Sequence, residues 1–265
     1  MDTLLLKLLL TPTLIGLASL AGRRWGPSVS GWLVALPLTS GPVTFFLALS
    51  HGTAFAAAAA LGTLTGTLSQ PAFCLTYGWV ALRCNWLVAF LAGVLAFAAC
   101  TVVLQYLTLP LPLLFLAAIV ALALAFLLLP KDTATFAAKT ISPPRWDLPA
   151  RMVLATAFIL LLTGLASTLG PRLTGLLAPF PLYVSILTIF AHRLQGAASA
   201  INVLRGLLLG LFGFASFFLL LSLLLEPAGI ALAFLAAIAA ALALQGISLW
   251  AMQRIMRAKE KPSVL

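Results

Sequence analysis

The chain alternates long apolar runs with short segments that carry its charges, prolines and glycines. The runs cover approximately residues 4–21, 28–49, 53–82, 86–108, 111–129, 152–169, 173–191, 195–225 and 228–252. A helix of about 20 apolar residues crosses the hydrocarbon core of a bilayer, and the longer third and eighth runs fit by tilting. The pattern predicts an all-α polytopic membrane protein with about nine transmembrane helices.

The same order of glycines and prolines occurs twice along the chain, 144 residues apart. Residues 26–66 align without a gap on residues 170–210. The matched pairs include Gly26 and Gly170, Pro27 and Pro171, Gly31 and Gly175, Pro37 and Pro181, Gly52 and Gly196, Gly62 and Gly206, and Gly66 and Gly210. Because glycine and proline mark special backbone conformations, this register predicts an internal duplication of backbone shape.

Basic residues separate between the two sides of the membrane when nine crossings are assumed. One side receives Arg23, Arg24, Arg83, Lys131, Lys139, Arg145, Arg151, Arg193, Arg254, Arg257, Lys259 and Lys261, and the other receives Lys7 and Arg172. Lys and Arg collect in cytoplasmic loops, so the N-terminus is expected outside and the C-terminus in the cytoplasm of an inner-membrane protein. This distribution accounts for the net charge of +10, so we expect no nucleic-acid partner.

The number of predicted crossings determines how the two copies are oriented relative to each other in the membrane. An odd number of crossings separates equivalent points, so Gly26–Pro27 is expected in the cytoplasm and Gly170–Pro171 outside. The predicted organisation is a first repeat over 1–108, a linker helix and cytoplasmic loop over 109–151, and a second repeat with a basic tail over 152–265. Two inverted four-helix repeats are an architecture of many secondary transporters. The retained first helix is favoured over a cleaved signal peptide because Arg23 and Arg24 follow it directly.

The second copy has the strongest family resemblance. It reads Gly175-Leu-Leu-Ala-Pro-Phe-Pro-Leu-Tyr183 and continues through Ala191-His192, Gln195-Gly196 and Arg205-Gly206. Over residues 170–225 this resembles the GlpM-like family of small four-helix inner-membrane proteins, in tandem here rather than in single copy. The resemblance implies an integral membrane protein associated with exopolysaccharide (alginate) production in some bacteria. Leu61 stands where the second copy has Arg205.

Prolines interrupt corresponding spans of the two repeats. Pro37 with Gly41-Pro42 lies in the second span, and Pro179 with Pro181 lies in the seventh. Proline removes a backbone donor and frees a carbonyl, and paired breaks in two repeats indicate a binding site near the midplane. The alternative is an ordinary kink relieved by a neighbouring helix.

Polar side chains follow one face of the predicted eighth helix, namely Gln195, Ser199, Asn202 and Arg205, at steps of three and four residues. Arginine inside a membrane is costly and usually faces a cavity, where its forked donors can hold an anion. We therefore predict that Arg205 points between the halves, towards the broken segments. The alternative is that Arg205 reaches the cytoplasmic interface.

The third predicted helix offers Thr67 and Gln70 on a comparable face. The threonine is expected either to line the site or to bond its own helix backbone. Gly62 and Gly66, four residues apart, are expected to let helices approach closely.

The remaining composition excludes several functions. The chain is 63% hydrophobic, and no acidic residue lies within a confident span. It lacks phosphate-binding, metal-ligand and nucleophile motifs, so we expect no enzyme, metal or cofactor. Cys74, Cys84 and Cys100 are expected to be small buried thiols.

Two functions remain after these exclusions. The sequence predicts a transporter or flippase-like permease for a small anionic or amphiphilic solute, with site residues Arg205, Asn202, Ser199, Gln195, Thr67, Gln70, Pro37 and Pro181. The alternative is a non-transporting membrane component that packs against a second copy or a membrane partner in envelope or exopolysaccharide assembly.

Overall fold

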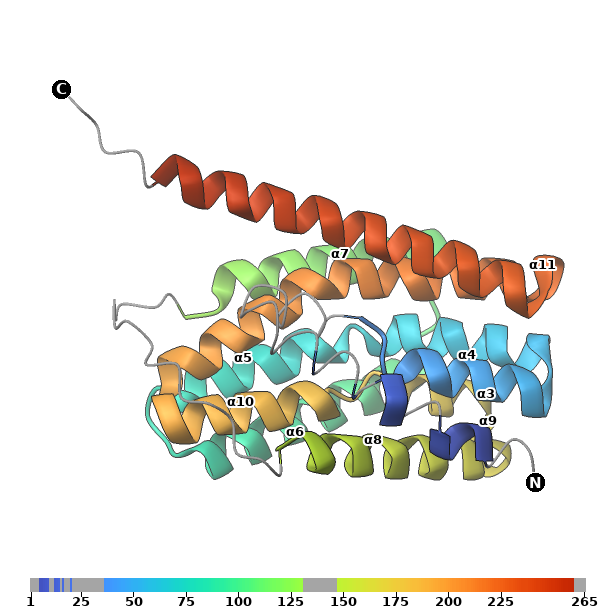
Figure 1. Ribbon diagram of the computed structural model, residues 1–265, viewed down its shortest axis with the longest axis horizontal. Helices are drawn as coiled ribbons and strands as arrows, with labels where there is room; N and C mark the ends of the chain where they lie inside the picture. The colour runs from blue at the N-terminus through green and yellow to red at the C-terminus, as the bar shows by residue number, and fades with distance from the viewer. Residues whose placement is uncertain are drawn as a thin grey trace.

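The protein is a bundle of helices in the part of the chain that the structure describes. The computed structural model describes residues 36–130 and 147–259, together with residues 5–9, 12–14, 16 and 20 (Figure 1). These residues form helices joined by short connections and include no strand. The predicted all-α class is confirmed for them.

Most of the principal helices follow one another with few intervening residues, whereas residues 129–146 lie between α7 and α8. In chain order they are α3 (Ser40–His51), α4 (Thr53–Gly66), α5 (Ser69–Ala81), α6 (Trp86–Tyr106), α7 (Leu111–Leu128), α8 (Asp147–Gly164), α9 (Ala166–Leu177), α10 (Leu182–Gln195) and α11 (Ala197–Lys259). Among the described residues, α6, α7 and α11 are long and apolar enough to cross a membrane. The pair α9 and α10, bent by 45°, adds a fourth candidate span.

The outer faces of the long helices are apolar. Leu95 and Val102 on α6, and Leu116 and Leu127 on α7, are all more than half exposed. A soluble monomer rarely exposes apolar surface on this scale, whereas a lipid-facing surface is expected to be apolar. The molecule is therefore a helical membrane protein.

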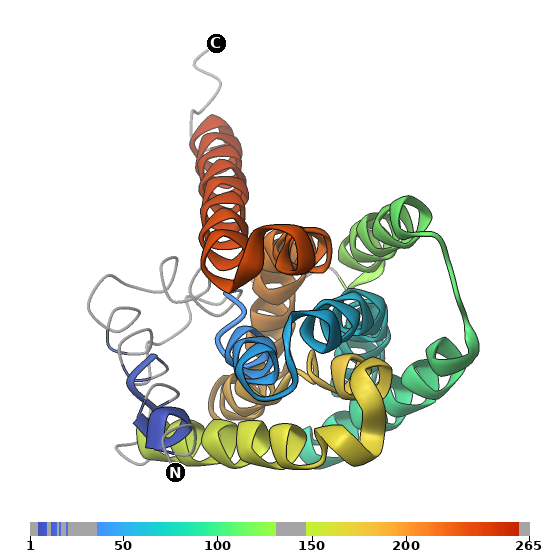
Figure 2. The same cartoon turned by 90° about the vertical axis from the view of Figure 1, so that its right-hand side faces the viewer.

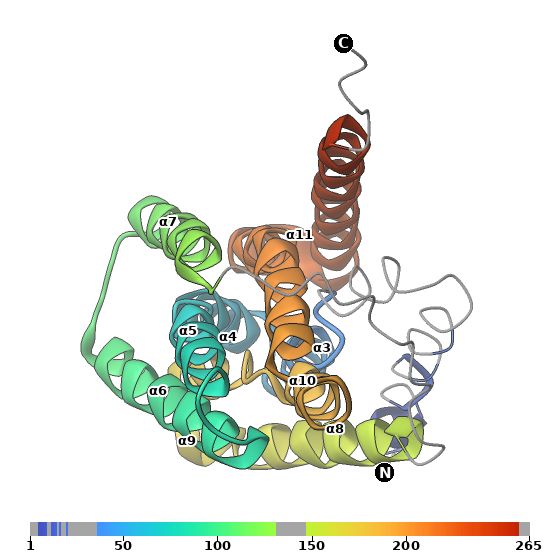
Figure 3. The ribbon, with the colours of Figure 1, turned by 90° about the vertical axis from the view of Figure 1, so that its left-hand side faces the viewer.

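The bundle has two ends, and we name each after the glycine turn it contains. The Gly52 end, which faces the viewer in Figure 2, contains the α3–α4 turn, the α6–α7 and α8–α9 connections and a turn within α11. The Gly196 end, which faces the viewer in Figure 3, contains the α5–α6 and α10–α11 connections and the end of α7.

Helix α11 is two antiparallel arms. Gly229 has φ 75° and ψ 176°, outside the helical region and readily adopted only by glycine, and Pro227 precedes it. This break falls between the predicted spans 195–225 and 228–252. Figure 1 shows the second arm returning along the first from the Gly52 end.

A proline separates α4 from α5 within the predicted third span. Pro71 cannot donate to the carbonyl of Thr67, and its ring crowds that carbonyl. The helical hydrogen-bond pattern is accordingly interrupted at Thr67 and Leu68, although both residues keep right-handed helical dihedral angles. The position matched to Pro71 by the 144-residue offset is Ala215, which lies within the uninterrupted first arm of α11.

Two glycines end helices at matched positions. Gly52 has φ 87° and ψ 168°, and Gly196 has φ 91° and ψ 178°. The second of these corrects the predicted eighth helix. Gln195 ends α10 and Ala197 begins α11, so Gln195 does not share a helix with Ser199, Asn202 and Arg205.

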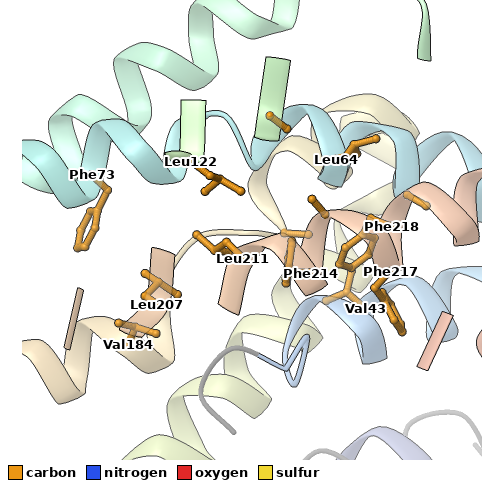
Figure 4. Close-up of a cluster of buried hydrophobic side chains, with 14 of the residues drawn as sticks. Val43, Leu64, Phe73, Leu122, Val184, Leu207, Leu211, Phe214, Phe217 and Phe218 are labelled. Atoms are coloured by element: carbon orange, nitrogen blue, oxygen red, sulfur yellow. The ribbon is translucent and has the colours of Figure 1, made fainter. Parts of the chain in front are cut away.

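The core surrounds the first arm of α11. Leu207, Leu211, Phe217 and Phe218 on this arm are buried, and Figure 4 shows them facing residues of the helices packed around it, such as Val43 on α3. Leu64 on α4, Leu122 on α7 and Val184 on α10 complete the surrounding shell. This packing fixes α3 and α10 close to the same central arm.

Glycines allow α4 and α9 to touch along their backbones. A Cβ on Gly62 would lie 2.7 Å from the carbonyl oxygen of Arg172, and one on Gly66 would lie 2.6 Å from that of Leu176. Gly175 faces them from α9. The predicted packing role of Gly62 and Gly66 is confirmed.

Candidate functional site: a polar cavity between two proline breaks

The two proline breaks share a pattern of backbone hydrogen bonds. The amide of Leu38 donates to the carbonyl of Leu36 at 2.7 Å, and the amide of Leu182 donates to that of Phe180 at 2.7 Å. Pro181, at the centre of the second turn, has φ −77° and ψ 51°, close to an inverse γ-turn. The proline carbonyls then accept the first helical bonds of α3 and α10, from Gly41 at 2.8 Å and Ser185 at 2.7 Å.

The breaks meet inside the bundle although they are far apart in the chain. The hydroxyl of Ser40, at the start of α3, donates to the carbonyl of Ala178 at 2.7 Å. The side-chain amide of Gln70, at the start of α5, donates to the carbonyl of Pro179. Both side chains are buried. Carbonyls that the second break leaves without helical donors are therefore satisfied by polar side chains of α3 and α5.

A cavity of about 40 Å³ lies at this meeting point. Leu36, Leu38, Thr39 and Ser40 line it from one break, and Pro179, Phe180, Pro181, Leu182, Tyr183 and Val184 from the other, with Gln70, Leu207, Leu211 and Phe214 between them. Its volume admits only a few water molecules. Gln70 lines this cavity, and its Oε1 atom is buried without a hydrogen-bond partner among the described residues.

Two helices begin at the cavity. Neither Thr39, the N-cap of α3, nor Pro181, the N-cap of α10, makes a side-chain capping bond. Amide groups in the first turn of a helix carry partial positive charge and favour a negatively polarised group nearby. The cavity is therefore suited to a group that accepts hydrogen bonds, with Gln70 Oε1 available for one that donates.

Of the predicted site residues, Gln70 and Pro181 lie at this cavity. Pro37 accepts the first bond of α3 beside it. Thr67 is buried, but its hydroxyl donates to the carbonyl of Thr63 at 2.9 Å, so it bonds its own helix. Ser40 was not predicted. Its position beside Pro37 and Gly41-Pro42 was the only signal in the sequence that could have identified it.

Arg205 lies elsewhere, and its predicted direction is wrong. Its Nη2 atom donates to the carbonyl of Pro130 at 2.7 Å and approaches that of Leu129 at 3.5 Å, just beyond the C-terminal end of α7. A cation there compensates the negative end of the helix dipole. Because Gly196 starts a new helix, Arg205 is only in the third turn of α11, near the Gly196 end rather than at the breaks.

The other residues of the predicted polar face do not line the cavity either. Gln195 and Asn202 are exposed, and Ser199 is half-buried. A polar contact that the sequence did not predict joins Tyr77 Oη and His192 Nδ1 at 3.2 Å, between α5 and α10. It links the helices that follow the cavity towards the Gly196 end.

The cysteines differ in their exposure. Cys74 is buried and Cys100 is half-buried, whereas Cys84 is exposed in the α5–α6 connection, contrary to prediction. All three are free thiols. Within the described residues no group of three His, Cys, Asp or Glu side chains is placed to hold a metal ion.

Comparisons with protein-family models, with curated proteins and with solved structures found no match. The resemblance to the GlpM-like family therefore stays a prediction.

Proposed function

We propose that the protein is an inner-membrane transporter or flippase-like permease for an amphiphilic solute, whose polar group passes through the cavity between the two breaks. One observation carries the proposal. Two proline-broken segments from distant parts of the chain meet at a small cavity that polar side chains help to line, as in transporters that bind substrate at discontinuous helices.

The inverted duplication is supported by where the matched turns lie. The turns at Gly52 and Gly196 are 144 residues apart and share their backbone conformation, and they lie at opposite ends of the bundle (Figure 1). The α5–α6 connection and the turn at Gly229 are likewise near-equivalent in sequence and opposite in position. Helices that are repeated but reversed are what an inverted repeat requires.

Described basic residues support the proposed orientation. Arg83 and Arg193 are exposed near the Gly196 end. Arg172 bonds the carbonyls of Leu104 and Leu107 near the Gly52 end, and Lys7 bonds the hydroxyl of Thr163 in the last turn of α8. With nine crossings, the Gly196 end faces the cytoplasm and the Gly52 end faces outside.

The residues that line the cavity determine which charge we propose for the substrate. Among the described residues no Lys, Arg, Asp or Glu lines the cavity, so the anionic preference inferred from Arg205 now rests on the starts of α3 and α10 instead. A cavity of about 40 Å³, which admits only a few water molecules, is too small for an amphiphilic solute. Transport therefore requires the two halves to move apart on each side in turn, with the breaks as the flexible positions.

The test is flux across liposomes that contain the purified protein. Gln70→Leu removes the donor to Pro179 and the unpartnered acceptor, and it should lower flux of an amphiphilic anion, a fluorescent phospholipid being the probe, without preventing insertion. Thr156→Val is the control, because Thr156 bonds its own helix at Met152, 2.7 Å away, and does not line the cavity. Equal flux in wild type, both variants and empty liposomes would refute the proposal.

A non-transporting membrane component is the second candidate. It is favoured by the positions of Arg172 and Arg205, which both bond the carbonyl ends of helices rather than a cavity. The exposed apolar faces of α6 and α7 would then contact a second copy or a partner protein. Absence of flux together with co-purification of a stable homodimer or partner complex would favour this function.

A further inference from the structure

An open apolar groove runs along the bundle between α6, α8 and α9. Its volume is about 490 Å³, far larger than that of the central cavity. Val94 and Ala98 line it from α6, Phe158 and Leu161 from α8, and Leu173 and Leu177 from α9. The groove continues the exposed apolar face of α6, a helix long and apolar enough to cross the membrane, so lipid chains lie against its opening.

The groove ends at the central cavity. Phe180, between Pro179 and Pro181, lines both spaces. Its ring packs edge-on against Phe97 with the centroids 5.4 Å apart and lies 6.3 Å from the ring of Phe158. One aromatic side chain on the broken segment therefore separates an apolar groove from a polar cavity.

The other end of the groove is polar. Gln105, near the end of α6, has a buried Oε1 atom without a hydrogen-bond partner among the described residues. Beside it, Tyr106 is 84% exposed, and Arg172 donates to the carbonyls of Leu104 and Leu107 on either side of these residues. Gln, Tyr and Arg are suited to a membrane interface, where an amphiphile has its polar group.

A second apolar groove, of about 510 Å³, shares four positions with the first under the 144-residue offset. The matched pairs are Leu14 and Phe158, Leu36 and Phe180, Ile238 and Val94, and Leu242 and Ala98. Leu36 lines both this groove and the central cavity, as Phe180 does for the first. The first broken segment thus places Leu36 and Leu38 between its groove and the cavity, and the second places Phe180 there.

We propose that the groove between α6, α8 and α9 binds an acyl chain of a membrane phospholipid, with Phe180 as the gate between this chain and the central cavity. The inference rests on the proposed function and specifies it: the transported amphiphile would enter sideways from the bilayer, with its chain in the groove and its polar group turning into the cavity. The groove volume, its exposure to lipid and the polar atoms at its two ends all fit one amphiphilic molecule.

The experiment uses neighbouring alanines of α6. Ala98 lines the groove and Ala99 does not, and both are exposed. The variant Ala98→Trp places an indole in the groove, whereas Ala99→Trp places the same ring on the outer face. Phospholipid that remains bound after purification in mild detergent is counted by native mass spectrometry. Wild type and Ala99→Trp should retain phospholipid, and Ala98→Trp should lose it.

A second pair of variants, on α8, keeps the inference testable if Ala98→Trp fails to fold. Leu161→Trp fills the groove from its other side, and Val153→Trp is its exposed control outside the groove. Equal phospholipid retention in groove and control variants overturns the inference, as does a groove variant that dissociates a dimer, since a second copy would then be the occupant.

Flux measured on the same proteins separates the two proposals. Phospholipid retention that is lost only in groove variants, without flux in any protein, supports the groove and refutes transport. Flux without groove-dependent retention refutes the groove alone. In the variant Phe180→Ala, phospholipid flux should rise because the gate is removed, while phospholipid retention should be unchanged. If the wild type transports and Phe180→Ala has the same flux, Phe180 is not a gate.

Discussion

At the scale of single residues, the role of a charged side chain depends on which neighbouring backbone groups it can reach. Arg205 has the sequence context of a buried anion site, yet its guanidinium bonds the carbonyl of Pro130 just beyond α7. Gln70 is less conspicuous in the sequence, yet its amide bonds the broken segment and its side chain lines the cavity. Proximity to freed carbonyls, rather than charge, identifies the candidate site.

Replacing Arg205 should therefore affect stability more than transport. A hydrogen bond to a charged group contributes about 1.5–3 kcal/mol, so Arg205→Leu should lower the unfolding free energy by about 1–3 kcal/mol. Thermal unfolding in detergent measures this. Arg193→Leu is the control, because Arg193 is exposed and stacks on Trp86 with a centroid distance of 5.3 Å, a contact of about 0.5–1 kcal/mol. An Arg205→Leu protein of unchanged stability that has lost all flux would restore the anion-site hypothesis.

At the scale of helices, glycine and proline decide both where elements end and how closely they pack. Gly52, Gly196 and Gly229 turn the chain with positive φ, and Pro71 divides α4 from α5. The closest crossing, between α4 and α9, positions the second break, because α9 leads directly into Ala178–Pro181.

Gly175→Ala should disrupt that crossing. A Cβ there would overlap the carbonyl oxygen of Ala59 and lie 2.8 Å from the Cα of Gly62, and backbone atoms have little freedom to move away. Overpacking of this kind costs about 1–3 kcal/mol, measurable as a lower melting temperature in detergent. In the control Gly246→Ala, a Cβ on α11 meets nothing within 4 Å, so stability should be unchanged or rise by up to about 1 kcal/mol. Similar melting temperatures for the two variants would contradict this account of the crossing.

At the scale of the whole molecule, each end of the bundle contains one turn of each matched pair. One end is proposed to face the cytoplasm and the other the outside. Turns matched by the 144-residue offset lie at opposite ends, which suits halves that are reversed relative to each other. Such an arrangement places both proline breaks between the ends, around the first arm of α11. The central position of the cavity follows from the packing of α3, α5 and α10 around this arm and not from any single helix.

Cysteine labelling tests this orientation with a native reporter. Cys84, exposed near the Gly196 end, should react with an impermeant maleimide only after spheroplasts are permeabilised. A cysteine introduced as His51→Cys at the Gly52 end should react from outside, in a background with the three native cysteines removed. Cys84 is examined alone in a Cys74→Ala, Cys100→Ala protein. Labelling of both positions from outside would contradict opposite exposure of the two ends.

The sequence by itself determined the helical class, the membrane-spanning apolarity and the turns near Gly52 and Gly229, because each depends on local properties. It placed Gly196 inside the predicted eighth helix, whereas the structure ends α10 there. Apolar run length sets whether a helix can cross a bilayer, and glycine or proline at Gly52, Pro71, Gly196 and Gly229 interrupts a helix through its own backbone. Gly26–Pro27 and the other residues of 21–35 lie outside the described residues, so their predicted topology stays a prediction.

Only the tertiary structure decided which polar groups share a site. The contacts of Ser40 with Ala178 and of Gln70 with Pro179 join residues 138 and 109 positions apart, and no local pattern encodes such pairs. The same holds for Arg205, whose partner Pro130 lies 75 positions away. Periodicity places a side chain on a face of its own helix, but the helix that packs against that face determines whether the side chain lines a cavity or bonds the end of a neighbouring helix.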